Sequence, residues 1–583
     1  MPNFFEDNED LLFLFDHLEL ADVAAVQEDD FMRNTGPNGE YAPLDAEDAI
    51  DNYRRVLSIV GDVAGNHIAP RAEQIDAEGN TLNADGTVTL HPGVQANLDV
   101  LAKADLMGFT LPREYGGLNC PCVVYTMATE MVSRADTSLM NLFGLQGIAE
   151  TIYAFASDEI KAEYLPRFAR GEVTGAMVLT EPDAGSDLQA VGLRAWQDDD
   201  GQWRLTGVKR FITNGCGEIL LTLARSEPDI KDGRGLSLFL AERGPRVRVR
   251  HLEEKLGIHG SPTCELVYDD TPAKLIGERQ RGLVTYVMSL MNGARVGIAG
   301  QSLGVAEAAY RVARQYAYTR KQFGVSIERL PAVAEMVTDM KIAIEAARAL
   351  TYETCRICDF ENNNLRVLEF NKPNDKDELN RRRGNGRTWK RLNSMLTPMS
   401  KYYASEMCIR VANEALQVLG GSGYMKDYPV ERYARDARIT TIYEGTSQLQ
   451  VVAAVRGVCS GAFEKHVDTY EQREYTDKAL NELKQKLVEA RLLVLEAIAF
   501  VKARGTEYMD LHGRRLVDSA IAVLVGHLFL RQATANERKR LVAQRFIEQH
   551  LPTIRRDIEI VRSGDQMAID HYKTLAGPVP SAS

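Results

Sequence analysis

The hexapeptide Tyr443-Glu444-Gly445-Thr446-Ser447-Gln448 contains a carboxylate in a setting that suits a catalytic base. A carboxylate can remove a proton from a carbon next to a carbonyl group if a dry pocket raises its pKa towards the working pH. Tyr443 supplies apolar bulk beside Glu444, and Gly445 allows the sharp backbone turn that presents the side chain. Taken alone, a Tyr-Glu-Gly sequence more often forms an exposed turn, so the prediction depends on other segments.

Four other segments accompany this hexapeptide along the chain: Leu179–Asp187, Phe211–Gly215, Arg320–Gly324 and Gln417–Gly421. In the first, Ala184-Gly185-Ser186 offers unhindered backbone amides and a hydroxyl, which suit a phosphate. Arg320 suits a pyrophosphate because its guanidinium donates two parallel hydrogen bonds. No G-x-G-x-x-G sequence follows a predicted strand, so a Rossmann dinucleotide site is not indicated.

In this order, the five segments resemble the acyl-CoA dehydrogenase family, and the resemblance runs from about Asp45 to Gly457. It implies that Glu444 removes the α proton of an acyl-CoA, that FAD takes the β hydride, and that a trans-2-enoyl-CoA leaves. The implied FAD contacts are Leu179, Thr180, Ser186, Phe211, Thr213, Arg320, Phe323, Gln417, Gly420, Gly421, Thr446 and Gln448. The implied substrate contacts are Ser186, Asn292, Arg295, Tyr443 and Gly445.

Several positions depart from what is common in relatives. Phe211 stands where many relatives carry Trp, which keeps an aromatic face but loses the indole donor. Gln322 replaces a frequent Thr, and Ala294 occupies the place where some relatives carry the catalytic Glu instead. Met140 falls near the position of an arginine that binds the distal carboxylate in glutaryl-CoA dehydrogenases. A dicarboxylyl substrate is therefore disfavoured.

The resemblance also implies partners. Arg320 and Phe323 match residues that reach the FAD of a neighbouring protomer, so a homo-oligomer, dimer or tetramer, is expected. Electron-transfer flavoprotein is the implied electron acceptor. The chain length and the segment Glu254–Thr263 look most like the large bacterial subgroup that includes 3-methylmercaptopropionyl-CoA dehydrogenases, although very-long-chain enzymes reach a similar length.

Three other functions share this pattern. An acyl-CoA oxidase would use the same chemistry with oxygen as the acceptor. A non-catalytic, flavin-bearing nucleic-acid-binding protein, or a helical scaffold protein, could be built on the same fold. The retained Glu444 and the acidic charge balance disfavour the nucleic-acid-binding alternative.

Periodicity predicts an α+β protein with an N-terminal helical domain (1–174), a β-barrel-like domain (175–282), a four-helix bundle domain that carries the FAD and catalytic motifs (283–460) and an extra C-terminal helical domain (461–583). Asp45 and Asp48 precede the first helical pattern as caps. A small-residue stripe predicts a tightly packed helix: Val296, Gly300, Leu303, Ala306, Tyr310, Ala313 and Ala317.

Two segments in the second half of the chain lie outside these motifs. The polar run from Glu361 to Arg391 breaks the periodicity and predicts an inserted loop or frayed connection, with a basic end around Trp389. That end could meet a coenzyme A phosphate, an acidic partner or an anionic membrane, or be a solvated loop. Beyond Thr476, an apolar seam at helical spacing predicts structural helices: Leu480, Leu483, Leu487, Ala490, Val494, Ala497 and Val501.

Composition limits the class of protein. The 583 residues are 45% hydrophobic and carry a formal net charge of −13, which disfavours a nucleic-acid surface. The eight cysteines include Cys120-Pro121-Cys122 and Cys355-x-x-Cys358, but no second pair stands at zinc-ligand spacing, so no metal site is predicted. No uninterrupted apolar run approaches the roughly 18 to 20 residues of a membrane span, and Met1–Leu20 is acidic, so membrane association is not expected and the cytoplasm is the expected location.

Overall fold

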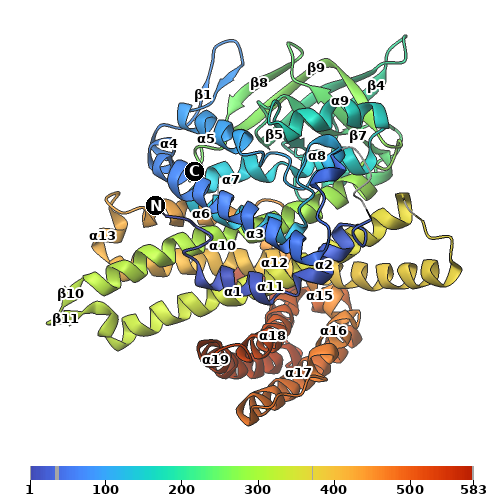
Figure 1. Ribbon diagram of the computed structural model, residues 1–583. Helices are drawn as coiled ribbons and strands as arrows, with labels where there is room; N and C mark the ends of the chain where they lie inside the picture. Colours follow the sequence, from blue (N-terminus) through green and yellow to red (C-terminus); the bar gives the residue numbers. More distant parts are fainter. Residues whose placement is uncertain (1, 33–37, 371, 581–583) are drawn as a thin grey trace. The chain divides into compact units, whose positions relative to one another are not determined.

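A computed structural model describes residues 2–32, 38–370 and 372–580 of the chain (Figure 1). By contacts between residues, the chain divides into two compact units. The first comprises Met1–Gly386 and Ala404–Thr446, and the second comprises Arg387–Tyr403 and Ser447–Ser583. The domain boundaries expected from sequence stay a prediction.

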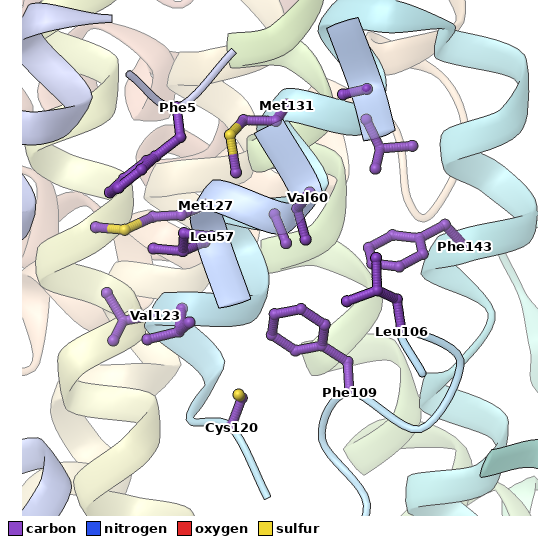
Figure 2. Close-up of a cluster of buried hydrophobic side chains, with 14 of the residues drawn as sticks. Phe5, Leu57, Val60, Leu106, Phe109, Cys120, Val123, Met127, Met131 and Phe143 are labelled. Atoms are coloured by element: carbon purple, nitrogen blue, oxygen red, sulfur yellow. The ribbon is translucent and has the colours of Figure 1, made fainter. Parts of the chain in front are cut away.

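The first unit begins with helices: those up to residue 144 share one apolar core, and the two over residues 147–169 pack with the following β strands in a second core. They are α1 (Glu9–His17), α2 (Leu20–Gln27), α3 (Ala46–Val63), α4 (Ala72–Glu78), α5 (Pro92–Lys103), α6 (Cys122–Ala135), α7 (Thr137–Gly144), α8 (Gly147–Phe155) and α9 (Asp158–Ala169). The predicted cap of α3 is confirmed, because the Asp45 side chain accepts a hydrogen bond from the Asp48 amide at 3.0 Å. Figure 2 shows Leu57 and Val60 of α3 packed among Val123, Met127 and other buried side chains.

The predicted β domain is a closed barrel. Its strands are β3 (Gly175–Val178), β4 (Arg194–Gln197), β5 (Trp203–Thr213), β6 (Ile219–Arg225), β7 (Leu236–Glu242), β8 (Val247–Leu252) and β9 (Thr263–Ile276). The path β6-β4-β5-β9-β7 returns to β6, because β6 and β7 pair antiparallel from Ile219↔Glu242 to Arg225↔Leu236. Strand β3 adds to β6, and β8 adds to β9. The barrel-like expectation is therefore confirmed.

Long helices follow the barrel: α10 (Met288–Thr319), α11 (Pro331–Phe370) and α12 (Lys376–Leu419), then α13 (Gly421–Tyr424) and α14 (Val430–Ala437). The small-residue stripe of α10 packs closely, as predicted, since a Cβ on Gly300 would lie 3.0 Å from Thr126 Cγ2 of α6. The hairpin β10 (Lys321–Gln322) and β11 (Val325–Ser326) joins α10 to α11 (Figure 1). A second small hairpin pairs β1 (Thr81–Leu82) with β2 (Val88–Thr89).

The inserted loop or frayed connection expected over Glu361–Arg391 is mostly helix, with only a short connection between two helices. Helix α11 continues to Phe370, and α12 begins at Lys376, so the basic segment lies on a helix. The Asp375 side chain caps α12 by accepting hydrogen bonds from the amides of Asp377 and Glu378 at 2.9 and 2.8 Å. Glu378 then pairs with Arg381 and Arg382, each at 2.7 Å, at the spacing that stabilises a helix. Local capping and ion pairs thus replace the missing apolar periodicity.

The second unit is helical. Besides residues 387–403 of α12, it contains α15 (Ser447–Cys459), α16 (Ala462–Glu471), α17 (Lys478–Arg504), α18 (Thr506–Ala533), α19 (Glu537–Arg562), α20 (Met567–Asp570) and α21 (Tyr572–Ala576). The predicted seam of α17 is confirmed, since all seven of its residues are buried. Helix α18 is long and apolar enough to cross a membrane, and 89% of its apolar window is buried inside the described structure, as in the core helix of a bundle.

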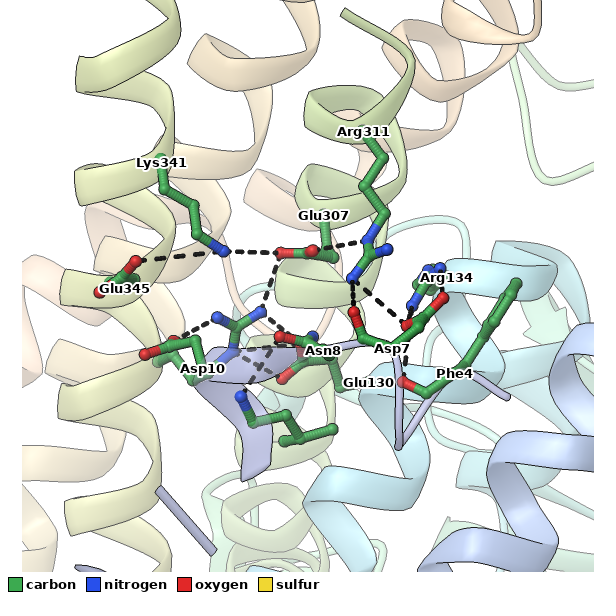
Figure 3. Close-up of polar contacts among 12 residues, drawn as sticks. Phe4, Asp7, Asn8, Asp10, Glu130, Arg134, Glu307, Arg311, Lys341 and Glu345 are labelled. Atoms are coloured by element: carbon green, nitrogen blue, oxygen red, sulfur yellow. Dashed lines mark hydrogen bonds and ion pairs between the residues drawn. The ribbon is translucent and has the colours of Figure 1, made fainter. Parts of the chain in front are cut away.

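A buried ion cluster joins the first-unit helices. Arg348 of α11, fully buried, contacts Glu130 of α6 at 2.7 Å and Glu307 of α10 at 3.1 Å, and also pairs with Asp10 of α1. Figure 3 shows these acids beside Lys341 and Arg311, which also pair with Glu307. The neighbouring positive charges keep the pKa of Glu307 well below its usual range, although burial alone would raise it. Four helices thus share one charge network.

A second buried carboxyl, Asp436 of α14, holds the turn before β9. It accepts a hydrogen bond from the Ile258 amide at 2.6 Å, and Ile258 has φ +49°, which is rare for a β-branched residue. Gly257 must be glycine, because a Cβ there would lie 2.6 Å from the carboxylate. Burial raises the pKa of Asp436 to about 7.

We expect Arg348→Met to destabilise the protein by about 3–5 kcal/mol, because three buried carboxylates would lose their shared cation. Urea unfolding at neutral pH measures this change. Arg54→Met is the control, since Arg54 pairs with Asp16 at a half-exposed site where a pair is worth about 0–1 kcal/mol. Equal effects of the two substitutions would contradict the role of the cluster.

We expect Asp436→Asn to change the pH dependence of stability. The folded carboxyl keeps its proton up to about pH 7, whereas the unfolded one loses it near its ordinary value of 3.8. Between these values the folded state binds more protons, so the free energy of unfolding falls as pH rises, by up to about 1.4 kcal/mol per pH unit. The amide carries no such proton, so the variant should gain stability relative to the wild type between pH 4 and 8. Parallel pH profiles would refute this account.

Candidate functional site

Glu444 lies on a strained turn. The short 3₁₀ segment Arg438–Thr441 ends just before it, and α15 begins at Ser447. Glu444 has φ +54° and Gly445 has φ +88°, so two successive residues adopt the left-handed region. For a non-glycine residue this backbone costs on the order of 1–3 kcal/mol and persists only where surrounding contacts impose it. The predicted sharp turn at Gly445 is present.

Tyr443 anchors this turn. Its buried hydroxyl lies within hydrogen-bonding distance of Gln301 Oε1 of α10 and 3.1 Å from Asn141 Oδ1 of α7. Burial raises the pKa of Tyr443 well above its usual range, so the side chain remains a neutral phenol. Tyr443, the residue just before Glu444, is therefore held against two helices.

Arg295 of α10 lies close enough to Glu444 for their charges to interact. Burial lowers the pKa of Arg295, and the negative charge of Glu444 acts in the opposite direction. Its Nη1 donates to Asn292 Oδ1 at 3.0 Å, while its buried Nε has no acceptor in the described part of the chain. The charges of Arg295 and Glu444 therefore interact across the site.

A second cluster forms at the end of β3. The Leu179 carbonyl accepts a hydrogen bond at 2.7 Å from Lys209 of β5, whose ammonium also lies 2.9 Å from Glu181. Glu181 in turn accepts from the amides of Gly192 and Leu193. Burial lowers the pKa of Lys209 to about 8, and the charge of Glu181 opposes this shift. These contacts fix the Leu179–Ser186 turn.

Lys209 is a site residue that the sequence motifs did not indicate. Its signal was present, because strand alternation places it on the inward side of β5 with Leu205, and a buried lysine needs a partner. Gln301 and Asn141 were also missed. They are isolated polar residues on apolar helices, and only the fold brings them to Tyr443.

Phe211 and Thr213 lie beside this turn. The Thr180 carbonyl accepts from the Arg210 amide at 2.9 Å, which aligns the two predicted cofactor segments. A bulge between Lys209 and Ile212 turns Phe211 outward with φ +60°, and its ring is 54% exposed. Ser186 is exposed on the same turn.

A third group gathers at the far end of α10. Phe323 in the β10–β11 hairpin has φ +50° and is 90% exposed, and Arg320 is exposed with no side-chain partner among the described residues. Tyr316 of α10 contacts Ser422 at 3.4 Å, which places the Gly420-Gly421 turn beside this hairpin end. A Cβ on either glycine would meet no atom within 4 Å. Gln417 is exposed one helical turn earlier.

The predicted residues therefore fall into three groups within the first unit: the Glu444 turn with Arg295, the Leu179–Phe211 cluster, and the Arg320–Gly421 group. Thr446 ends the first unit partly exposed, whereas Gln448 is exposed at the start of α15 in the second unit. No cluster of histidine, cysteine and carboxylate side chains that could hold a metal occurs in the described ranges.

Family models match most of the chain. The N-terminal, middle and C-terminal domains of acyl-CoA dehydrogenase match residues 51–172, 176–271, and 281–372 with 379–459, and "Acyl-CoA dehydrogenase C terminal" matches 459–556. An acyl-CoA dehydrogenase of Bacillus subtilis is 37% identical, covering 60% of this chain and 86% of its own. The 3-methylmercaptopropionyl-CoA dehydrogenase of Ruegeria pomeroyi is 33% identical over 76% of this chain and 74% of its own.

Solved structures agree. Butyryl-CoA dehydrogenase from Megasphaera elsdenii superimposes with a TM-score of 0.59 and 30% identity, covering 70% of this chain and 98% of its own. An acyl-CoA dehydrogenase from Bacillus anthracis, complexed with FAD, shares the fold over 91% of this chain and 92% of its own, with a TM-score of 0.74 and 23% identity. The resemblance drawn from the five sequence segments is thus confirmed, and the chain belongs to the acyl-CoA dehydrogenase family.

Proposed function

We propose that this protein catalyses the FAD-dependent α,β-dehydrogenation of an acyl-CoA thioester to a trans-2-enoyl-CoA. The observation that carries the proposal is Glu444, a carboxylate held on a left-handed turn by the buried Tyr443 and close to Arg295. Such a strained, anchored acid beside a partly unsatisfied cation is typical of a catalytic group.

In this mechanism Glu444 takes the α proton of the thioester onto its carboxylate. The free Nε–H of Arg295 can stabilise negative charge that develops on the substrate. Tyr443 keeps the neighbouring backbone from moving away from the substrate. Gly445 and Asn292 border the same group, and we propose that they contact the thioester together with Ser186. Bound FAD supplies the acceptor for the hydride that leaves the β carbon.

The residues present fit FAD. The exposed face of Phe211 can stack on an isoalloxazine ring, and the backbone of Leu179 and Thr180 with the Thr213 hydroxyl offers polar contacts to its edge. Arg320 has an unused planar donor set for a pyrophosphate, and Phe323 can cover an adjacent ring. The open space over Gly420 and Gly421 admits a nucleotide against the backbone, while Gln417, Thr446 and Gln448 are further proposed contacts.

We further propose a homo-oligomer, dimer or tetramer, in which Arg320 and Phe323 reach the FAD of a second protomer. The proposal is supported by the exposure of both side chains: Arg320 is exposed and Phe323 is 90% exposed, so a second chain has access to them. Electron-transfer flavoprotein is the proposed electron acceptor. One chain of similar fold, with a TM-score of 0.60 and 31% identity, belongs to a structure described as the electron transferring flavoprotein of Acidaminococcus fermentans. A four-helix bundle over residues 283–460 and a cytoplasmic location remain part of this proposal.

We expect Glu444→Gln to retain FAD but to slow anaerobic flavin reduction by acyl-CoA by about 10²- to 10⁴-fold or more, because the amide has the same shape without a basic oxygen. Stopped-flow bleaching of the flavin measures this rate. Glu335→Gln, an exposed acid on α11, is the control. Near-normal reduction by the Glu444 variant would refute the assigned base.

We expect Arg320→Ala to weaken FAD binding roughly 10- to 100-fold and to weaken the oligomer. The reason is that the guanidinium would no longer donate hydrogen bonds to the FAD of the second protomer, which links the two subunits. Flavin content after dialysis and sedimentation velocity measure the two effects. Arg329→Ala, at an exposed arginine in the segment after the same hairpin, is the matched control. Full flavin occupancy with unchanged sedimentation would reduce Arg320 to a surface residue.

A further inference from the structure

Asn141 of α7 carries unused hydrogen-bond donors beside the catalytic turn. Its side chain is 7% exposed, and its Oδ1 lies 3.1 Å from the Tyr443 hydroxyl and 3.0 Å from Gln301 Nε2. Its Nδ2 is buried and has no acceptor among the residues that the structure describes. Nothing in the proposed mechanism uses this group.

The orientation of the Asn141 amide is fixed by its neighbours. Gln301 Nε2 also lies 3.3 Å from the Thr137 carbonyl, which can only accept a hydrogen bond, so this atom of Gln301 must be the donor. The atom of Asn141 that faces it must then be the oxygen. The two N–H groups of Nδ2 therefore point away from this network. Such an unpaired buried donor costs free energy unless a ligand or water accepts its hydrogen bonds.

The face of α10 that precedes Gln301 carries glycines in place of larger side chains. Gly293 and Gly297 share one face of α10, because they are one turn apart. A Cβ on Gly297 would lie 3.8 Å from Met140 Cε of α7, whereas a Cβ on Gly293 would meet no atom within 4 Å. A Cβ on Gly147 of α8 would lie 3.6 Å from Leu290 Cδ1 of α10. Gly293 thus borders open space on the face of α10 that leads to Gln301, a partner of Asn141.

We infer that the acyl chain of the substrate enters this space and that Asn141 Nδ2 donates a hydrogen bond to an oxygen on that chain. The substrate class is an acyl-CoA with a neutral hydrogen-bond acceptor, such as a hydroxyl, ether or ketone oxygen, beyond the β carbon. An amide donor brings no charge, so a neutral oxygen matches it better than a buried carboxylate. This inference rests on the proposed function, since it identifies the acyl group that the Glu444 site takes.

The test compares saturated acyl-CoAs with analogues of equal length in which one ether oxygen replaces a methylene at positions 4 to 7. Dissociation constants come from isothermal titration of the FAD-loaded protein, and kcat/KM comes from flavin reduction. At one position we expect the oxa analogue to bind at least roughly tenfold more tightly than its alkyl parent, because the acceptor satisfies the buried donor. Equal or weaker binding of every oxa analogue overturns the inference.

Two variants test Asn141 itself. Asn141→Leu and Asn141→Asp both remove the Nδ2 donors at nearly constant volume, and the aspartate can still accept from Tyr443 and Gln301. The oxa-over-alkyl ratio should fall to about one in each folded variant, whereas Asn119→Leu, at a buried asparagine whose Nδ2 donates to Glu28, should keep it. A preserved ratio in both Asn141 variants overturns the assignment. Preferential binding without any flavin reduction would instead support the inference and refute the proposed function.

Discussion

The hydrogen bond of one buried phenol determines the geometry on which the rest of the site depends. Glu444 adopts a backbone that its residue type disfavours, and no helix or strand holds it. Tyr443 precedes Glu444, and its hydroxyl contacts Gln301 of α10 and Asn141 of α7. The turn is therefore held against two helices. Helix α10 is in turn fixed by close packing of its glycines on α6 and by the Arg348 ion cluster of α1, α6, α10 and α11. The core contacts thus hold the helix that positions the Glu444 turn.

The same principle recurs at the proposed cofactor groups. Phe211 and Phe323 share with Glu444 a left-handed backbone, with φ of +60°, +50° and +54°. At each one a local device imposes the conformation: a β-bulge at Phe211, a two-residue hairpin at Phe323 and an anchored turn at Glu444. The two aromatic rings are turned outward, where a ligand or a second chain can cover them. A left-handed backbone at these three proposed ligand contacts fits a site that is formed before the substrate binds.

Much of this could be predicted from sequence, where local chemistry decides the outcome. The Asp45 cap, the α10 stripe, the α17 seam and the Gly445 turn are set by residues a few positions apart. The helical start of α12 was missed because it depends on capping and ion pairs, not on apolar spacing. Lys209, Asn141 and Gln301 could not be assigned, since their partners lie far away in the chain and only the closed barrel and the packed helices bring them together.

The central claim is that Glu444 removes the α proton, and the most direct measurement isolates that step from hydride transfer. A 3-thia-acyl-CoA has sulfur at the β position, so no hydride can leave, while its α protons can still exchange with solvent. In D₂O, mass spectrometry should show α deuteration catalysed by the FAD-loaded wild type and reduced to the uncatalysed rate in Glu444→Gln of equal flavin content. Equal exchange catalysed by both proteins would contradict the account.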